Sequence, residues 1–95
     1  MVHSLRYRFD LPSNWWYRHL GAVGPFASKV EIAENEVTDD NIIITIVIVK
    51  KDFIEKSDNI HSVVVERDDE TNFIVRGPKD LASHIQEIAD SLRTF

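Results

Sequence analysis

The sequence lacks cysteine altogether and contains only three glycines and three prolines. The absence of cysteine excludes disulfides, thiolate zinc sites and cysteine nucleophiles, and it suits a reducing cytoplasm, where we expect the protein to reside. The glycines form neither a phosphate-binding loop nor a dinucleotide-binding fingerprint. The longest apolar run, "IIITIVIV" at residues 42–49, is far shorter than the ~20 residues needed to cross a bilayer, so we expect no membrane-spanning segment.

The length of 95 residues fits a single domain, 1–95, and is too short for two independent cores. Hydrophobic residues make up 43% of the chain and charged residues 28%, close to the averages of globular proteins. A folded domain is therefore expected rather than a disordered chain.

The net charge of −5 is unevenly distributed along the chain. Residues 1–30 hold four cations and one carboxylate, whereas residues 31–95 hold seven cations and fifteen carboxylates. An acidic surface repels nucleic acid, so direct binding to DNA or RNA is not expected.

The first third of the chain predicts a strand and a short helix. Residues 5–11 alternate between apolar and polar side chains, the period of a half-buried strand, which Pro12 ends. Ser13 is a suitable N-cap and Gly21 a suitable helix terminus, so residues 13–21 predict a short helix. Trp16 and Leu20 would then share one face of that helix.

The middle of the chain predicts four further strands in two hairpins. The first hairpin joins residues 29–37 to residues 42–49, and the second joins residues 60–66 to residues 73–76. The strand at 42–49 is apolar on both faces and rich in β-branched residues, which indicates a central position in the sheet.

The C-terminal segment predicts a long helix over residues 78–95, beginning with Pro78. Its apolar residues recur at helical spacing and would pack on the sheet. They are Leu81, Ile85, Ile88 and Leu92.

The predicted fold class is α+β: a largely antiparallel sheet of about five strands, with one short N-terminal helix and one long C-terminal helix packed on it. One long helix covers one face of such a sheet, and a short helix is thin cover for the other. We therefore expect a homodimer, in which a second copy supplies the missing surface.

Motifs for catalysis and metal binding are absent from the sequence. The segment "DDNIIITIVIVK" has neither the glycine nor the glutamate that an EF-hand loop requires. The histidines form no H-x-H pair and no H-E-x-x-H motif; they are His3, His19, His61 and His84. We expect no enzyme activity, no cofactor and no dedicated metal site.

Three consecutive aromatic residues, Trp15, Trp16 and Tyr17, stand out in a chain with two tryptophans. They either fill the sheet face that the long helix leaves open or serve as interface anchors, since tryptophan and tyrosine are enriched at binding hot spots.

The basic side chains of the first thirty residues also allow two interpretations. Arg6 and Arg8, with Arg18 near, could hold an anion, or they could neighbour the acidic part of the molecule.

The carboxylates are the strongest candidates for partner binding. On a strand, side chains at i and i+2 are about 6.6–6.8 Å apart, close to two steps of about 3.4 Å along a nucleic acid strand. Glu34 with Glu36, and Glu66 with Asp68, have this sequence spacing. The acidic surface would consist of Glu34, Glu36, Asp39, Asp40, Glu66, Asp68, Asp69, Glu70, Asp80, Glu87 and Asp90. Such a surface either competes for a basic cleft that holds DNA or is simply solvated.

The segments "ENEVTDD" and "ERDDE", the short length and the absence of cysteine give the chain a resemblance to small accessory proteins of tailed phages. Among these it is similar to the T-even anti-restriction nuclease proteins, which are acidic DNA mimics. The resemblance implies a dimeric phage early protein in the host cytoplasm, an inhibitor that occupies the DNA-binding surface of a host restriction nuclease or nucleoid protein. The basic "RYR" segment departs from this acidic character. The alternative function is a homodimeric structural or adaptor module that binds proteins without DNA mimicry.

Overall fold

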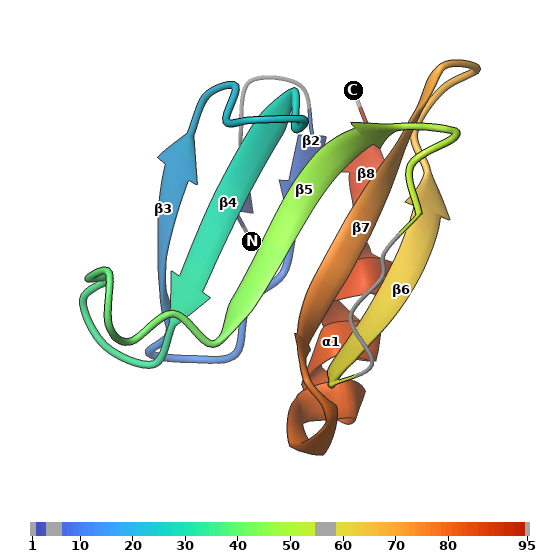
Figure 1. Cartoon of the computed structure of the whole chain (residues 1–95). Coiled ribbons are helices and arrows are strands. Elements are labelled where there is room, and N and C mark those ends of the chain that lie inside the picture. The colour runs from blue at the N-terminus through green and yellow to red at the C-terminus, as the bar shows by residue number, and fades with distance from the viewer. Residues whose placement is uncertain (1, 4–6, 55–58, 95) are drawn as a thin grey trace.

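A computed structural model describes residues 2–3, 7–54 and 59–94 of the chain (Figure 1). It contains a five-stranded antiparallel sheet in the order β3-β4-β5-β7-β6, a three-stranded sheet in the order β1-β2-β8, and one α-helix. The main-sheet strands are β3 (Trp16–Leu20), β4 (Ser28–Ala33), β5 (Ile44–Lys50), β6 (Ile60–Glu66) and β7 (Thr71–Pro78). The other elements are β1 (Val2–His3), β2 (Tyr7–Phe9), the 3₁₀ turn η1 (Lys79–Leu81), α1 (Ala82–Ser91) and β8 (Arg93–Thr94).

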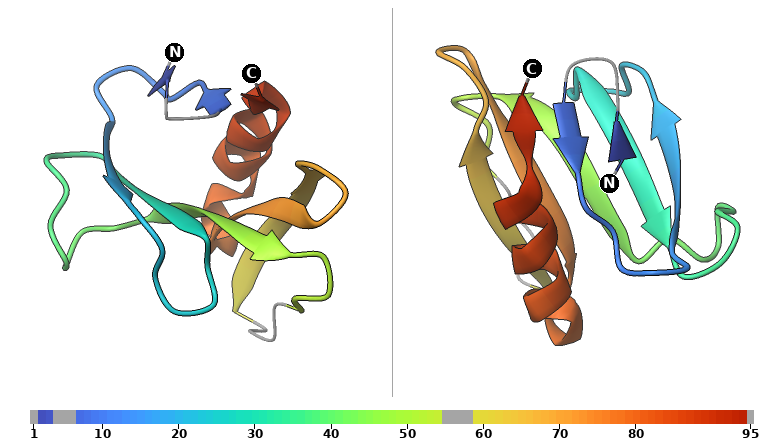
Figure 2. Two further views of the ribbon diagram at one scale, coloured as in Figure 1. Left: turned by 90° about the horizontal axis from the view of Figure 1, so that it is seen from above. Right: turned by 180° about the vertical axis from the view of Figure 1, so that it is seen from behind.

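The helix and the small sheet lie on the same side of the main sheet (Figure 2). We call this side the helix face and the opposite side the loop face. The main core lies on the helix face, where α1 packs against β6, β7 and β2. Its largest fully buried side chains come from both sheets and from α1; they include Phe9, Phe73, Ile32, Ile44, Ile46, Ile85 and Ile88.

Strand β5 is central, as the sequence predicts, with β4 on one side and β7 on the other. Ile44 and Ile46 belong to the main core, while Val47 and Val49 form a second, smaller core on the loop face. Both faces of β5 are therefore buried, because each has apolar neighbours.

The loop face is partly covered by loops of the same chain. Phe26 and Phe53 pack on the second core, and the Arg76 guanidinium lies 5.0 Å from the centre of the Phe26 ring. These loops cover part of the apolar surface for which the sequence suggested a second copy. The apolar loop face alone therefore does not require a dimer.

The predicted short helix at residues 13–21 is wrong, because this segment contains strand β3. A spacing of four, as between Trp16 and Leu20, also keeps two side chains on one face of a strand. The chain enters β3 through a turn in which the Trp15 N–H donates to the Pro12 carbonyl, with Asn14 at a φ of 71°. Asparagine is one of the few residues that tolerate this conformation.

The C-terminal helix is present but shorter than the predicted residues 78–95. The 3₁₀ turn η1 precedes it, and the backbone becomes extended at Leu92, where it leads into β8. Of the predicted apolar stripe, Ile85 and Ile88 are buried on α1, Leu92 is buried just after the end of α1, and Leu81 is half-buried in η1. In the described part of the chain, no helix is long and apolar enough to cross a membrane.

The predicted N-terminal strand is confirmed for Tyr7–Phe9, but it lies in the small sheet, where β8 is one of its neighbours. Arg6 lies outside the described residues. The predicted strand at residues 29–37 ends at Ala33, and residues 34–43 form a loop between β4 and β5.

The two tryptophans have different environments, which predicts different effects on stability. Trp15 packs against the main core and its ring centre lies 5.1 Å from that of His84, whereas Trp16 is 52% exposed. We expect Trp15→Ala to lower the free energy of unfolding by about 2–3 kcal/mol and Trp16→Ala to change it by less than about 0.5 kcal/mol. Urea denaturation of both variants tests this, and a larger loss for Trp16→Ala would contradict it.

Candidate functional site

Strand β3 forms one edge of the main sheet and exposes two large aromatic side chains. It is hydrogen-bonded to β4, with Trp16 opposite Ala33 and Leu20 opposite Lys29. Within the described ranges, no strand pairs with its outer edge. Trp16 is 52% exposed on the loop face and Tyr17 is 46% exposed on the helix face.

Tyr17 is held in place from the small sheet, since the centre of its ring lies 6.3 Å from that of Phe9 in an edge-to-face arrangement. Of the three predicted interface anchors, Trp16 and Tyr17 are thus accessible to a partner. Trp15 instead packs on the core of its own chain.

A buried carboxylate fixes the middle of β3 to β4. Glu31 is only 5% exposed, and its Oε1 accepts a hydrogen bond of 2.9 Å from Arg18 Nε. Arg18 Nη2 also contacts this oxygen and donates to Asp39 Oδ1 at 3.0 Å, while Lys29 Nζ lies 3.7 Å from Glu31 Oε2. The hydrogen bond to Glu31, followed by that to Asp39, raises the pKa of the Arg18 guanidinium, so Arg18 stays charged.

The loop of residues 34–43 carries four of the predicted acidic site residues beside this edge. The Asn41 side chain stabilises the loop: its Oδ1 accepts from the Thr38 N–H, and its Nδ2 donates to the Glu36 carbonyl. Asp39 binds Arg18, and all four carboxylates are exposed; they belong to Glu34, Glu36, Asp39 and Asp40. Because Trp16 pairs with Ala33, the last residue of β4, this acidic loop begins next to Trp16.

The β6–β7 turn carries a second acidic group. Asp68 Oδ1 accepts from the backbone N–H groups of Glu70 and Thr71, and Asp68 Oδ2 accepts from Arg67. The hydrogen bond from the Glu70 N–H, followed by that from the Thr71 hydroxyl, lowers the pKa of the Asp68 carboxyl below its ordinary value of 3.8. Asp68 therefore builds the turn, and Glu66 binds Lys51 at 2.8 Å.

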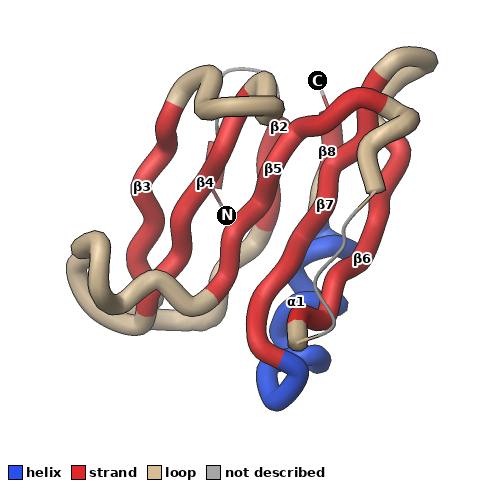
Figure 3. The backbone as a smooth tube through the Cα atoms, in the orientation of Figure 1, coloured by secondary structure: helices blue, strands red, loops and turns tan. Residues whose placement is uncertain are grey.

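The loop of residues 34–43 and the β6–β7 turn, which carry these two acidic groups, lie at opposite ends of the main sheet (Figure 3). The loop of residues 34–43 leads into β5 at Ile44, whereas the β6–β7 turn joins the other end, where Lys50 pairs with Thr71. Neither predicted pair of carboxylates lies within a strand, because β4 ends before Glu34 and β6 ends at Glu66. The extended strand on which the expected spacing of about 6.6–6.8 Å depends is therefore absent at Glu36 and at Asp68.

The three remaining acidic residues, Asp80, Glu87 and Asp90, are exposed on η1 and α1. Asp90 accepts a hydrogen bond from Gln86 at 2.8 Å. The predicted acidic residues, all of which lie in the described ranges, thus occupy three separate areas: the loop of residues 34–43, the β6–β7 turn, and the segment of η1 and α1.

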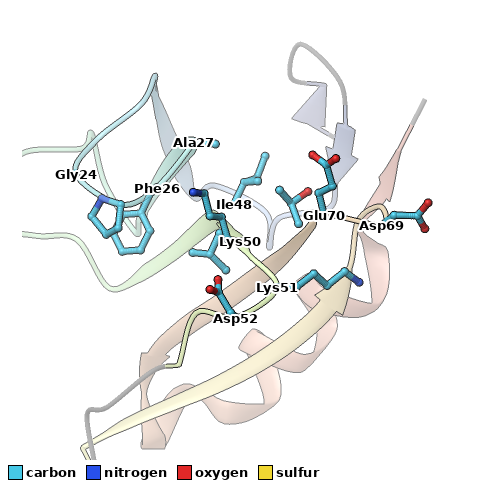
Figure 4. Close-up of a pocket in the computed structure, with 12 residues that line it drawn as sticks. Gly24, Phe26, Ala27, Ile48, Lys50, Lys51, Asp52, Asp69 and Glu70 are labelled. Atoms are coloured by element: carbon cyan, nitrogen blue, oxygen red, sulfur yellow. The ribbon is translucent and has the colours of Figure 1, made fainter.

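A groove of about 640 Å³ lies on the side of the β6–β7 turn and was not predicted from the sequence (Figure 4). Phe26, Ile48 and Val49 contribute apolar surface, and Lys50 and Asp52 contribute charge. The "GPF" and "KKD" segments both line the groove but lie far apart in the sequence. Only the fold brings them together.

The histidines and arginines named from the sequence are dispersed. His19 Nε2 lies 2.9 Å from the Ser28 hydroxyl in an exposed pair, His61 is on β6 and His84 is on α1. Arg8 lies in the small sheet, whereas Arg18, on β3, is bound to Glu31 of β4 and to Asp39 of the loop. Among the described residues, no three histidine, aspartate or glutamate side chains are grouped as metal ligands.

Comparison with protein-family models, with curated proteins and with solved structures gives no match for this chain. Any functional proposal therefore rests on the geometry of the molecule itself.

Proposed function

We propose that the chain is a protein-interaction module that binds other proteins along the outer edge of β3. The observation that carries this proposal is the pair of half-exposed aromatic side chains, Trp16 and Tyr17, on a strand whose outer edge is free in the described part of the chain. Tryptophan and tyrosine provide large contact areas at low entropic cost and dominate many protein interfaces.

The backbone of β3 adds directional hydrogen bonds to this surface. An edge strand presents unpaired N–H and C=O groups that an extended segment of a partner can bind. The adjacent loop supplies negative charge through Glu34, Glu36 and Asp40, so a partner strand flanked by basic residues would fit best.

DNA mimicry is a second candidate function, which the exposed carboxylates of Glu34, Glu36 and Asp40 favour. Their loop is held by Asn41 and Thr38, so the charges have defined positions. Because the acidic areas lie at opposite ends of the sheet and on the helix, a long continuous row of charge would need more than one chain. The proposed partner in this case is a basic DNA-binding protein.

One retention experiment separates the two functions. The immobilised protein is exposed to a bacterial lysate and eluted with a salt gradient, in parallel with three variants. These are the aromatic variant Trp16→Ala/Tyr17→Ala, the charge-reversed variant Glu34→Lys/Glu36→Lys/Asp40→Lys, and the control Val64→Ala, which truncates an exposed side chain on the opposite edge strand. Asp39 is left unchanged because it binds Arg18.

We expect the aromatic variant to lose partners by about 30-fold or more in affinity, since hot-spot truncation costs at least about 2 kcal/mol. Retention by the native protein should fall only modestly as the salt concentration rises, because the flanking charges add little next to the aromatic contacts, and Val64→Ala should behave like the native protein. Steep salt dependence and loss only in the charge-reversed variant would instead favour DNA mimicry. Equal retention by all variants would refute both functions at these surfaces.

A further inference from the structure

The outer edge of β3 is suited to pairing with an identical strand. It has five residues. The backbone N–H and C=O groups on its inner edge pair with β4, whereas those on its outer edge point away from the sheet. Two exposed aromatic side chains on such an edge are unusual, because edge strands of monomers are commonly protected by lysine, proline or a bulge.

Symmetry restricts how two copies of β3 can pair. In an antiparallel pair, opposed residues point to the same face of the sheet. A twofold axis normal to the sheet must therefore pass between one residue and the same residue of the second copy. Centring the axis on Arg18 gives complete overlap of the strand. Trp16 then faces Leu20 of the second copy, and Tyr17 faces His19 of the second copy.

These opposed pairs cover the apolar surface that a single chain leaves exposed. Opposed side chains in antiparallel strands have Cβ atoms about 4.5–5.5 Å apart, within contact distance for an aromatic and an aliphatic side chain. Trp16 and Leu20 of each chain form two such contacts on the loop face. Tyr17 and His19 form two more on the helix face.

The charges around the axis balance. Arg18 of each copy would face the other, which alone would be repulsive. Each Arg18 is bound to Glu31 and Asp39, and Lys29 lies beside Glu31, so each chain contributes two positive and two negative groups. The set is neutral, so the two facing arginines add no net charge to the interface.

The opposite edge strand, β6, is less suited to self-pairing. An axis centred on Val63 would place Glu66 against the apolar Ile60 of the second copy. It nevertheless exposes Val64 at 59%, which makes it the natural control for experiments on β3.

We propose that two copies of this chain pair antiparallel through β3, centred on Arg18, to form one continuous ten-stranded sheet. This inference rests on the proposed function, in which the β3 edge is the binding surface, and it names the second copy as the occupant. An interface of a single strand pair is small, below the ~1,200 Å² of typical stable complexes, so a dissociation constant in the micromolar range is expected.

Sedimentation equilibrium of the native protein from about 1 to 200 μM tests the association. We expect a monomer–dimer equilibrium that Trp16→Lys weakens at least about 30-fold, since it replaces a hot-spot aromatic with an edge lysine. Val64→Lys should leave the equilibrium unchanged. Thermal unfolding of each variant verifies that it is folded, since both substitutions are at exposed positions.

Cysteine pairs test the register directly, because the native chain has no cysteine. In the proposed dimer, a mixture of Trp16→Cys chains and Leu20→Cys chains places one introduced thiol opposite another and keeps one Trp16–Leu20 contact, so the mixture should oxidise to a covalent dimer. Each variant alone should remain largely uncrosslinked, because its thiols are not opposed.

A native protein that stays monomeric throughout the concentration range would overturn the inference. So would a dimer weakened by Val64→Lys and not by Trp16→Lys, or crosslinking of each cysteine variant alone as efficient as that of the mixture. The retention experiment reads out other partners independently. A monomer that still loses its lysate partners on Trp16→Ala/Tyr17→Ala therefore refutes self-pairing and leaves the proposed function intact.

Discussion

Replacing Phe73 with alanine is expected to lower the free energy of unfolding by about 3–5 kcal/mol, the usual cost of removing a fully buried phenyl ring. Phe73 is 1% exposed on β7, and its ring meets the Tyr7 ring of β2 edge-to-face, with centres 4.9 Å apart. It thereby connects the main sheet to the small sheet. Denaturant unfolding measures the loss, which is a large part of the roughly 5–15 kcal/mol of a typical domain.

The matched control for Phe73→Ala is Val64→Ala on the neighbouring strand of the same hairpin. Val64 points to the loop face and is largely exposed, so its truncation should change stability by less than about 0.5 kcal/mol. If Phe73→Ala were equally mild, the two sheets would not be joined through this ring.

Introducing a methyl group at Gly77 is expected to destabilise the fold by at least about 1–3 kcal/mol. A Cβ atom at this position would lie 2.7 Å from the carbonyl oxygen of Ile43, 3.2 Å from Ile44 Cγ1 and 3.3 Å from Ile85 Cδ1. The first of these is a backbone atom and cannot rotate away, so β7 would have to shift from the start of β5 or from α1.

Gly21→Ala is the control for Gly77→Ala, because a Cβ atom there meets nothing within 4 Å and no left-handed backbone angle is involved. It should be neutral or stabilise the protein by up to about 1 kcal/mol through the unfolded state. Thermal unfolding of the pair decides the matter. Equal melting temperatures would show that β7 and β5 are less closely packed at Gly77 than described.

Much of the main sheet could be predicted from local sequence patterns. β5 was recognisable because its β-branched residues are apolar on both faces, and the buried face of α1 because Ile85 and Ile88 recur at helical spacing. These patterns report burial directly. Burial in turn is what decides secondary structure in such segments.

The edge strand β3 was mistaken for a helix because its apolar spacing fits both structures. The pairing that makes it a strand depends on Glu31, thirteen residues beyond Arg18, and on the turn at Asn14. Cross-strand pairs leave no local periodic signal. The aromatic residues were found from the sequence, but which of them is exposed depends on this assignment.

The distribution of the acidic residues could not be predicted, because it depends on strand order. Asp40 and Glu70 are both in turns next to strands, yet β7 inserts between β5 and β6 and places the turns at opposite ends. Because β4 ends at Ala33 and β6 ends at Glu66, neither predicted carboxylate pair lies along a strand.

The insertion of β7 between β5 and β6 also affects synthesis of the chain. At about 5–20 residues per second, a ribosome needs roughly one to six seconds to proceed from Lys50 to Pro78. During this interval the apolar β5 has no β7 to pair with, and a free strand of this composition is prone to aggregate. Asp39 and Asp40 precede β5, Lys50 is its last residue, and Lys51 and Asp52 follow it. Charged residues on both sides of an apolar strand act as gatekeepers against aggregation, so we expect Asp39 and Asp40 to protect the nascent chain before any partner is bound.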